Sequence, residues 1–126
     1  MITGIDHVVL TVRDIERAVA FYTRVLDMQA ISFAGGRRAL LAGNQKINLQ
    51  TIGQETRNHA CIGSGDICLL TSLPPDQVMA RLHEQGVAIL EGPVQKSGAR
   101  GVITSVYFND PDGNLVEVSS YADDAT

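Results

Sequence analysis

The sequence of 126 residues has no tryptophan, only two cysteines and no long hydrophobic run. Cys61 and Cys68 lie seven positions apart, a spacing that matches neither a metal site nor a redox motif. We therefore expect reduced thiols in a cytoplasmic protein. Because a membrane helix needs about 20 apolar residues, no transmembrane segment is expected. The first ten residues also lack the basic region and cleavage site of a signal peptide.

Clusters of one charge are also missing. The chain has 10 lysines and arginines against 14 acidic residues, which gives a net charge of −4. Nucleic acids and anionic membranes are bound by basic faces, so neither is expected as a partner. With 44% hydrophobic and 19% charged residues, the composition is typical of a globular protein. The length fits one domain that spans residues 1–126.

The first half of the chain has the pattern of one strand, one helix and three strands. Residues 6–12 are β-branched and alternate between two faces, as in a strand. Asp14 has the character of a helix N-cap, and apolar residues follow it at helical spacing through Leu26. Three short apolar stretches with glycine or asparagine turns between them then predict strands at residues 28–33, 38–42 and 46–51.

The same pattern restarts after a polar, glycine-containing linker at residues 53–65. A strand is predicted at 66–71, followed by a helix that opens at Pro74-Pro75 and closes at Gly86. Further strands are predicted at 87–90, 101–109 and 115–121, with a tight turn between the last two. The repeat predicts an α+β fold of two tandem βαβββ modules, at residues 1–52 and 66–122. We expect them to form a curved sheet around a concave metal or ligand cavity.

Alternation along each strand predicts which side chains enter this cavity, because successive residues point to opposite faces. Val8, Leu10 and Val12 are expected beneath the first helix. Ile67, Leu69, Val116 and Val118 are expected beneath the second. The residues left to face the cavity are His7, Val9, Thr11, Lys46, Asn48, Gln50, Asp66, Cys68, Leu70, Leu115, Glu117 and Ser119.

Three of these residues are candidate metal ligands. His7, Asp66 and Glu117 lie on first and last strands of the two modules, and Asn48 occupies the remaining equivalent position. An imidazole with two carboxylates suits a divalent first-row cation, and an amide oxygen or water can complete the shell. The alternative is that His7 is half-buried without a ligand role and that Asp66 caps a strand. Glu117 favours the metal, because a carboxylate in a buried strand needs a cation.

Three stretches resemble the vicinal oxygen chelate superfamily, which includes glyoxalase I, bleomycin-resistance proteins, fosfomycin-resistance thiol transferases and extradiol dioxygenases. They span residues 5–12, 20–26 and 107–118. Residues 38–40, 44–49 and 63–68 resemble the short glyoxalase-domain-containing branch. The resemblance implies the duplicated βαβββ fold, a small-molecule substrate and a homodimer.

The resemblance also implies roles for individual residues. The histidine of the family's first strand falls on His7, and the glutamate of its last strand falls on Glu117. A second family histidine is replaced by Asp66, since His59 lies seven residues earlier in the linker. The glutamate of glyoxalase I in the fourth strand falls on Asn48, which cannot act as a base. Proton abstraction would therefore fall to Glu117, or to Asp66 released from the metal.

Three further residues are candidates for the reaction or for substrate binding. Tyr107 falls where fosfomycin-resistance transferases have a substrate-contacting tyrosine, and its alternative is a ring packed on a strand. Gln50 faces the cavity, and Arg100 precedes a strand, where it could bind an anionic group of the substrate. The alternative for Arg100 is a solvated loop position.

Two classes of function remain open. The first is a divalent-metal enzyme that chelates neighbouring oxygens of a small substrate, with the lyase or isomerase activity of glyoxalase I or, as a second reaction, that of an extradiol dioxygenase. The metal would be manganese, nickel, zinc or iron, and glutathione is a candidate co-substrate. The second class is a metal-free binding protein of the bleomycin-resistance type, in which Asp66 and Glu117 attract a cationic ligand.

Overall fold

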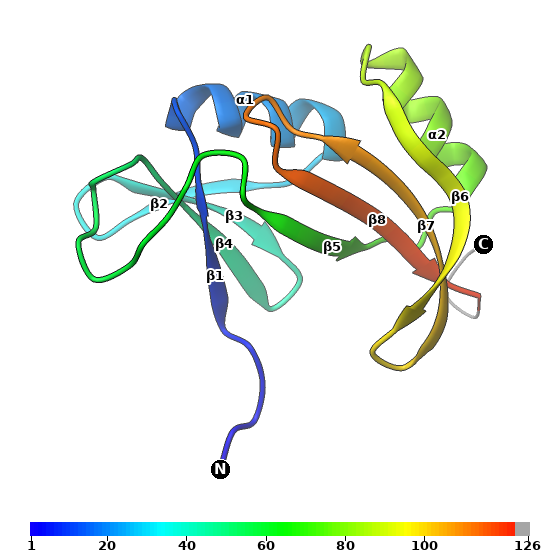
Figure 1. The fold of residues 1–126 in the computed structure, drawn as a ribbon, viewed down its shortest axis with the longest axis horizontal. Helices are drawn as coiled ribbons and strands as arrows, with labels where there is room; N and C mark the ends of the chain where they lie inside the picture. The colour runs from blue at the N-terminus through cyan, green and yellow to red at the C-terminus, as the bar shows by residue number, and fades with distance from the viewer. Residues whose placement is uncertain (123–126) are drawn as a thin grey trace. The chain divides into compact units, whose positions relative to one another are not determined.

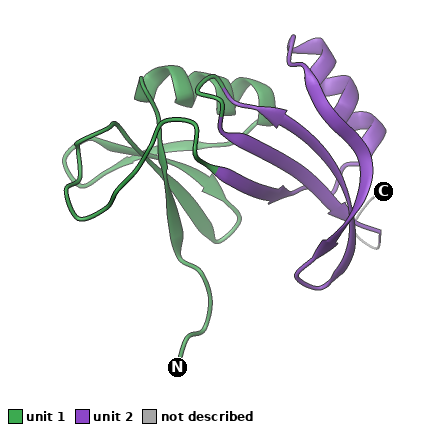
Figure 2. Cartoon of the chain, in the orientation of Figure 1, with its two compact units in different colours: residues 1–65, 111–113 green, residues 66–110, 114–126 purple. Residues whose placement is uncertain are grey.

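A computed structural model describes residues 1–122, and the last four residues of the expected domain lie outside this part (Figure 1). Its contacts divide the chain into two compact units, each with one helix and one four-stranded sheet (Figure 2). The first unit comprises residues 1–65 and 111–113, and the second comprises residues 66–110 and 114–122. The two βαβββ patterns and the α+β class expected from the sequence are confirmed.

The first unit contains β1 (His7–Thr11), α1 (Ile15–Leu26), β2 (Ala30–Phe33), β3 (Arg37–Ala42) and β4 (Gln45–Gln50). Its strand order is β1-β4-β3-β2. The first and last strands pair in parallel, and the other neighbours are antiparallel. A parallel pair needs a long crossover, which the helix and two hairpin strands provide here.

The second unit repeats this topology. It contains β5 (Asp66–Leu70), α2 (Pro75–Glu84), β6 (Ile89–Gly98), β7 (Gly101–Asn109) and β8 (Leu115–Tyr121). The strand order is β5-β8-β7-β6, and β5 pairs in parallel with β8. Neither helix in residues 1–122 is long and apolar enough to cross a membrane.

Helix α1 begins at the residue that the sequence pattern indicates. The Asp14 side chain accepts a hydrogen bond of 2.9 Å from the backbone N–H of Arg17, which satisfies one free donor of the first turn. The helix ends at Asp27, whose φ of 57° is left-handed. Tyr22 and Val25 are fully buried, as are Leu40 and Ile47 of the sheet, so the core of this unit lies between α1 and one sheet face.

Alternation in the strands separates the two faces of each sheet. In the second unit Val78 and Leu82 of α2 are buried together with the apolar residues of one β7–β8 face: Val106, Phe108, Val116 and Val118. The intervening residues form the other face, here called the helix-free face. In the first unit Val8 departs from its expected place beneath the helix, because it is 43% exposed. It lies on edge strand β1, and burial on that strand begins at Leu10.

Strand β6 is longer than the sequence pattern predicts. A strand is expected at residues 87–90, whereas the structure extends it from Ile89 to Gly98. The sequence pattern does not predict this extension, because it contains Gly92 and Pro93, and both residue types usually interrupt a strand. The strand tolerates them because it is the edge of its sheet, and its pairing with β7 shifts register between Glu91 and Val94.

The cap of α1 gives a testable prediction. Replacing Asp14 with alanine removes the hydrogen bond to Arg17 and should lower the free energy of unfolding by about 1 kcal/mol. Asp14→Asn is the matched control, because its amide oxygen can accept the same bond. Urea denaturation followed by circular dichroism measures both variants. Equal destabilisation by alanine and asparagine would contradict the capping role.

Candidate functional site

Glu117 lies at the centre of a polar group on the helix-free face of the second sheet. It occupies β8, where it is directly opposite Tyr107 on β7 and Cys68 on β5. Ser105 and Ser119 form the next pair along the same face. Both serines are buried and Glu117 is half-buried, so the polar groups of this face must satisfy one another.

The two serine hydroxyls hold the carboxylate of Glu117. Ser105 Oγ donates to Glu117 Oε2 at 2.5 Å, and Ser119 Oγ lies 3.3 Å from the same oxygen. The two hydroxyls are 2.7 Å apart, and the thiol of Cys68 donates to Ser119 at 3.2 Å. The chain of bonds therefore orients one carboxylate oxygen on this face.

Glu117 also affects the acidity of its neighbours. Desolvation, the hydrogen bond to Glu117 and its negative charge together raise the pKa of Tyr107 to about 12. Burial is likewise the main cause that raises the pKa of the Cys68 thiol, and the negative charges of Glu117 and Asp66 raise it further. The hydrogen bond to Ser119 acts in the opposite direction and lowers this pKa. Both groups therefore keep their protons at neutral pH. Tyr107 can donate a hydrogen bond there, whereas Cys68 is a poor nucleophile.

His7 begins β1 in the first unit and has a carboxylate neighbour. Its Nδ1 lies 2.7 Å from Asp6 Oδ1, and 43% of the imidazole side chain is exposed. Metal-binding histidines usually have such a carboxylate on the second ring nitrogen, where it fixes the tautomer and the ring orientation. With Nδ1 engaged, Nε2 is the nitrogen that can coordinate a cation.

Asn48 and Gln50 of β4 share the helix-free face of the first sheet. Gln50 is buried and donates from Nε2 to Thr11 Oγ1 at 2.9 Å, so its amide is held in place. Asn48 is only 5% exposed, and its Oδ1 has no hydrogen-bond partner in residues 1–122. A buried amide oxygen without a partner is uncommon in proteins. It is chemically suited to a hydrogen-bond donor or a cation.

The other candidates are exposed. Asp66 is the first residue of β5, and His59 lies in the stretch between β4 and β5. The backbone N–H of Arg100 donates to the hydroxyl of Tyr121 at 2.9 Å, and its guanidinium lies 4.3 Å from the centre of that ring. Arg100 therefore packs on Tyr121 at the β6–β7 turn.

The structure brings together some of the expected residues. Glu117 and Tyr107 are joined by a hydrogen bond in the second unit, which also carries Asp66, while His7 and Asn48 belong to the first unit. Within residues 1–122, no three His, Cys, Asp or Glu side chains form a group that could hold a metal. Ser105 was not among the sequence candidates, although its two-residue spacing from Tyr107 places it on the same face.

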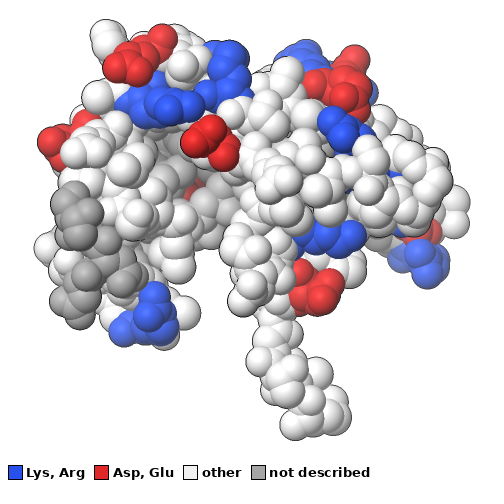
Figure 3. All heavy atoms as spheres, turned by 180° about the vertical axis from the view of Figure 1, so that it is seen from behind, with Lys and Arg blue, Asp and Glu red and all other residues white. Residues whose placement is uncertain are grey.

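Charge is distributed without a single-sign surface on the face that Figure 3 shows. Lysine and arginine side chains lie beside acidic ones, with broad uncharged areas between them. Several arginines have carboxylate partners, as Arg38 has Glu16 and Arg13 has Asp112.

Comparison with known proteins places the chain in a family. Residues 4–118 match the model of the Glyoxalase/Bleomycin resistance protein/Dioxygenase superfamily. The chain belongs to this superfamily. Its members bind small-molecule substrates, and divalent metals are common among them. The resemblance inferred from the sequence is thereby confirmed.

Individual relatives extend this result. Virulence protein STM3117 of Salmonella typhimurium is 45% identical over 96% of this chain and 86% of its own length. Its crystal structure has a TM-score of 0.90 and covers 97% and 99% of the two chains. The integron cassette protein VCH_CASS1 from the mobile metagenome of V. cholerae is 50% identical. Its structure has a TM-score of 0.90 and covers 97% of this chain and 98% of its own. Metallothiol transferase FosB of Shouchella clausii is 30% identical over 94% of this chain and 80% of its own length.

The contact between Glu117 and Tyr107 gives a second prediction. Glu117→Gln removes the negative charge that opposes ionisation of the phenol, so the pKa of Tyr107 should fall from about 12 toward its ordinary value near 10. Carbon-13 NMR of labelled tyrosine rings follows this titration, and Tyr107→Phe assigns the signal. A pKa of Tyr107 that is the same with and without the carboxylate would show that Glu117 does not control it.

Proposed function

We propose that this protein is a divalent-metal-dependent enzyme that chelates two neighbouring oxygens of a small substrate, with a lyase or isomerase reaction like that of glyoxalase I. The observation that carries the proposal is the environment of Glu117. Its carboxylate is half-buried and oriented by two serines, and no lysine or arginine in residues 1–122 forms an ion pair with it. Such a carboxylate is costly without a cation, which a bound metal would provide.

The donor atoms fit a first-row divalent cation. His7 has one ring nitrogen engaged by Asp6 and the other available, and Asn48 has a buried oxygen without a partner. Together with Glu117 and Asp66 they offer one nitrogen and several oxygens, a set compatible with manganese, nickel, zinc or iron. The proposal requires ligands from both units to reach one cation, within one chain or across the homodimer that we also propose.

A bound cation would supply Lewis-acid stabilisation of an enolate or alkoxide. The side chains of this protein would manage the protons. Asn48 has an amide and cannot serve as a base, so proton abstraction falls to Glu117 or Asp66. Ser105 and Ser119 fix the orientation of Glu117. Tyr107 keeps its phenolic proton at neutral pH and donates it to Glu117, so it could donate to a substrate oxygen only by releasing that bond.

Glutathione is proposed as a candidate co-substrate of this reaction. The FosB relative is a metallothiol transferase by name, and the resemblance to glyoxalase I implies glutathione. Gln50, and more weakly Arg100, are proposed to contact the substrate. The Cys68 thiol is not proposed as the nucleophile, because burial and neighbouring carboxylates raise its pKa.

An extradiol dioxygenase reaction is the second enzymatic candidate, since dioxygenases belong to the same superfamily. It is disfavoured by Asp66, which replaces one of the two histidines of such iron sites. A metal-free binding protein of the bleomycin-resistance type is favoured by one observation. Asp66 and Glu117 place two carboxylates in β5 and β8 that no lysine or arginine of residues 1–122 pairs with, and such acidic groups attract a cationic ligand.

The metal proposal predicts a loss of bound metal in two variants. His7→Ala and Glu117→Ala should fold normally and yet retain less than about a tenth of the wild-type metal, because each removes a direct ligand. Elemental analysis of protein purified without added metal measures the content. His59→Ala is the matched control, since His59 is exposed and is not a proposed ligand.

The same samples separate the two classes of function. A chelator should lower the melting temperature of wild type and of His59→Ala, because a metal held by the folded state stabilises it. It should leave His7→Ala unchanged. If wild type contains no metal and takes up none on titration, the enzyme proposal fails, and the sequestering function becomes the better account.

A further inference from the structure

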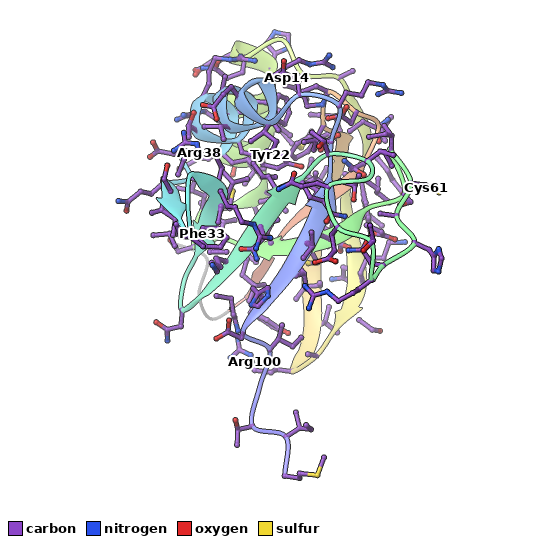
Figure 4. All side chains as sticks on the ribbon, turned by 90° about the vertical axis from the view of Figure 1, so that its left-hand side faces the viewer. Asp14, Tyr22, Phe33, Arg38, Cys61 and Arg100 are labelled. Atoms are coloured by element: carbon purple, nitrogen blue, oxygen red, sulfur yellow. The ribbon has the colours of Figure 1, made fainter. Side chains whose placement is uncertain are left out.

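The helix-free face of the first sheet carries two cations beside one aromatic ring. Lys46 Nζ lies 3.5 Å from the centre of the Phe33 ring, and Arg37 Cζ lies 5.2 Å from it. The three residues come from β4, β2 and β3, and they are here called the Phe33 cluster. Figure 4 labels Phe33 at the end of β2. All three belong to the first unit.

Register shows that the cluster lies on the face opposite the helix. Phe33 is directly opposite Arg37, and Ile31 is opposite Ala39, which faces Asn48 on β4. Lys46 is two residues from Asn48 and therefore shares its face. The neighbouring residue Arg38 lies on the other face, where its guanidinium pairs with Glu16 of α1.

The two cations of the cluster have no carboxylate partner. Arg13, Arg38 and Arg57 each form an ion pair with an acidic side chain, whereas neither Lys46 nor Arg37 does so in residues 1–122. Both carry the same charge and approach the same ring, so they repel each other. A lysine in a surface strand can extend its ammonium group into water at little cost. Lys46 instead is half-buried, with its ammonium group over the Phe33 ring. An anion bound beside these cations would relieve the repulsion.

We propose that the Phe33 cluster binds the carboxylate of a small organic acid, with Lys46 and Arg37 as its charge partners and the Phe33 ring as the surface for its carbon atoms. Guanidinium and ammonium donors suit an oxyanion, and an aromatic ring beside them favours a ligand with apolar or aromatic carbon next to the acid. Lys46 is the register partner of His7. The acid therefore binds on the sheet face that carries the proposed ligand His7.

This inference deepens the proposed function by naming the substrate as anionic. Only the identification of the bound acid as the substrate rests on the proposed function. The binding site itself uses no metal. It can therefore be tested on protein treated with a chelator, where loss of the metal site and loss of the anion site are separate results.

Mandelate and mandelamide are suitable probes, because they share a ring and a hydroxyl and differ in the charge of one group. We expect NMR titration of chelator-treated protein to show saturable binding of mandelate, with shifts at the Arg37 Nε–H and the Phe33 ring. Mandelamide should bind at least about fivefold more weakly. Higher ionic strength should weaken mandelate alone, because salt screens exposed charges.

Matched variants locate the site. Lys46→Gln and Arg37→Gln should each weaken mandelate by about fivefold, and Phe33→Leu should weaken both probes. Lys96→Gln is the control, since Lys96 lies 5.7 Å from the Tyr107 ring in the second unit and is a similar cation–aromatic pair. Its affinity should match wild type. Melting temperatures within a few degrees of wild type confirm that each variant is folded.

Four results would overturn the proposal: no saturable binding of mandelate, equal affinity for both probes, unchanged mandelate affinity in folded Lys46→Gln and Arg37→Gln, or shifts centred on Lys96 and Tyr107. If mandelate binds as expected while His7→Ala still contains metal, the anion site stands and the metal site fails. If His7→Ala loses the metal as expected and mandelate does not bind, the metal site stands and the anion site fails.

Discussion

The structure depends on one constraint, which is that a single helix covers only one face of each four-stranded sheet. Strand side chains alternate, so every second residue is packed beneath a helix and the others must find partners on the opposite face. In the second sheet Val116 and Val118 are packed on the α2 side, while Glu117 between them is turned to the helix-free face. Ser105 and Ser119 on that face donate hydrogen bonds to its carboxylate. The polar chemistry of the protein follows from this division.

The fold could be predicted from the sequence because its signals are local. Asp14 caps α1, and the apolar stripe that follows ends at Leu26, so the predicted helix agrees with the observed one. The length of β6 could not be predicted in this way, because an edge strand tolerates a Gly-Pro pair that a central strand excludes. Exposure of Val8 was missed for a related reason, since strand alternation gives a face but not how far a helix reaches along it.

The candidate site was predictable only as a set of positions. Alternation placed Glu117 and Ser119 on one face, and the structure confirms that the two side chains lie within hydrogen-bonding range of each other. Ser105 was missed because serine in a strand is unremarkable in sequence, and its importance comes from pairing across strands with Ser119. The Phe33 cluster was missed for the same reason. Phe33 and Lys46 lie on different strands, and the contact between the ammonium group and the ring is seen only in the folded sheet.

The turn between β7 and β8 has a consequence for the order in which the protein can fold. Residues 111–113 belong to the first unit, where Asp112, with 2% of its side chain exposed, accepts hydrogen bonds from the backbone and guanidinium of Arg13. These partners are separated by 99 positions in the chain. During synthesis from the N-terminus, the first unit therefore lacks part of its own structure until residues 111–113 have been made. Strands β1 to β4 can pair early, but the unit is complete only when its last three residues arrive.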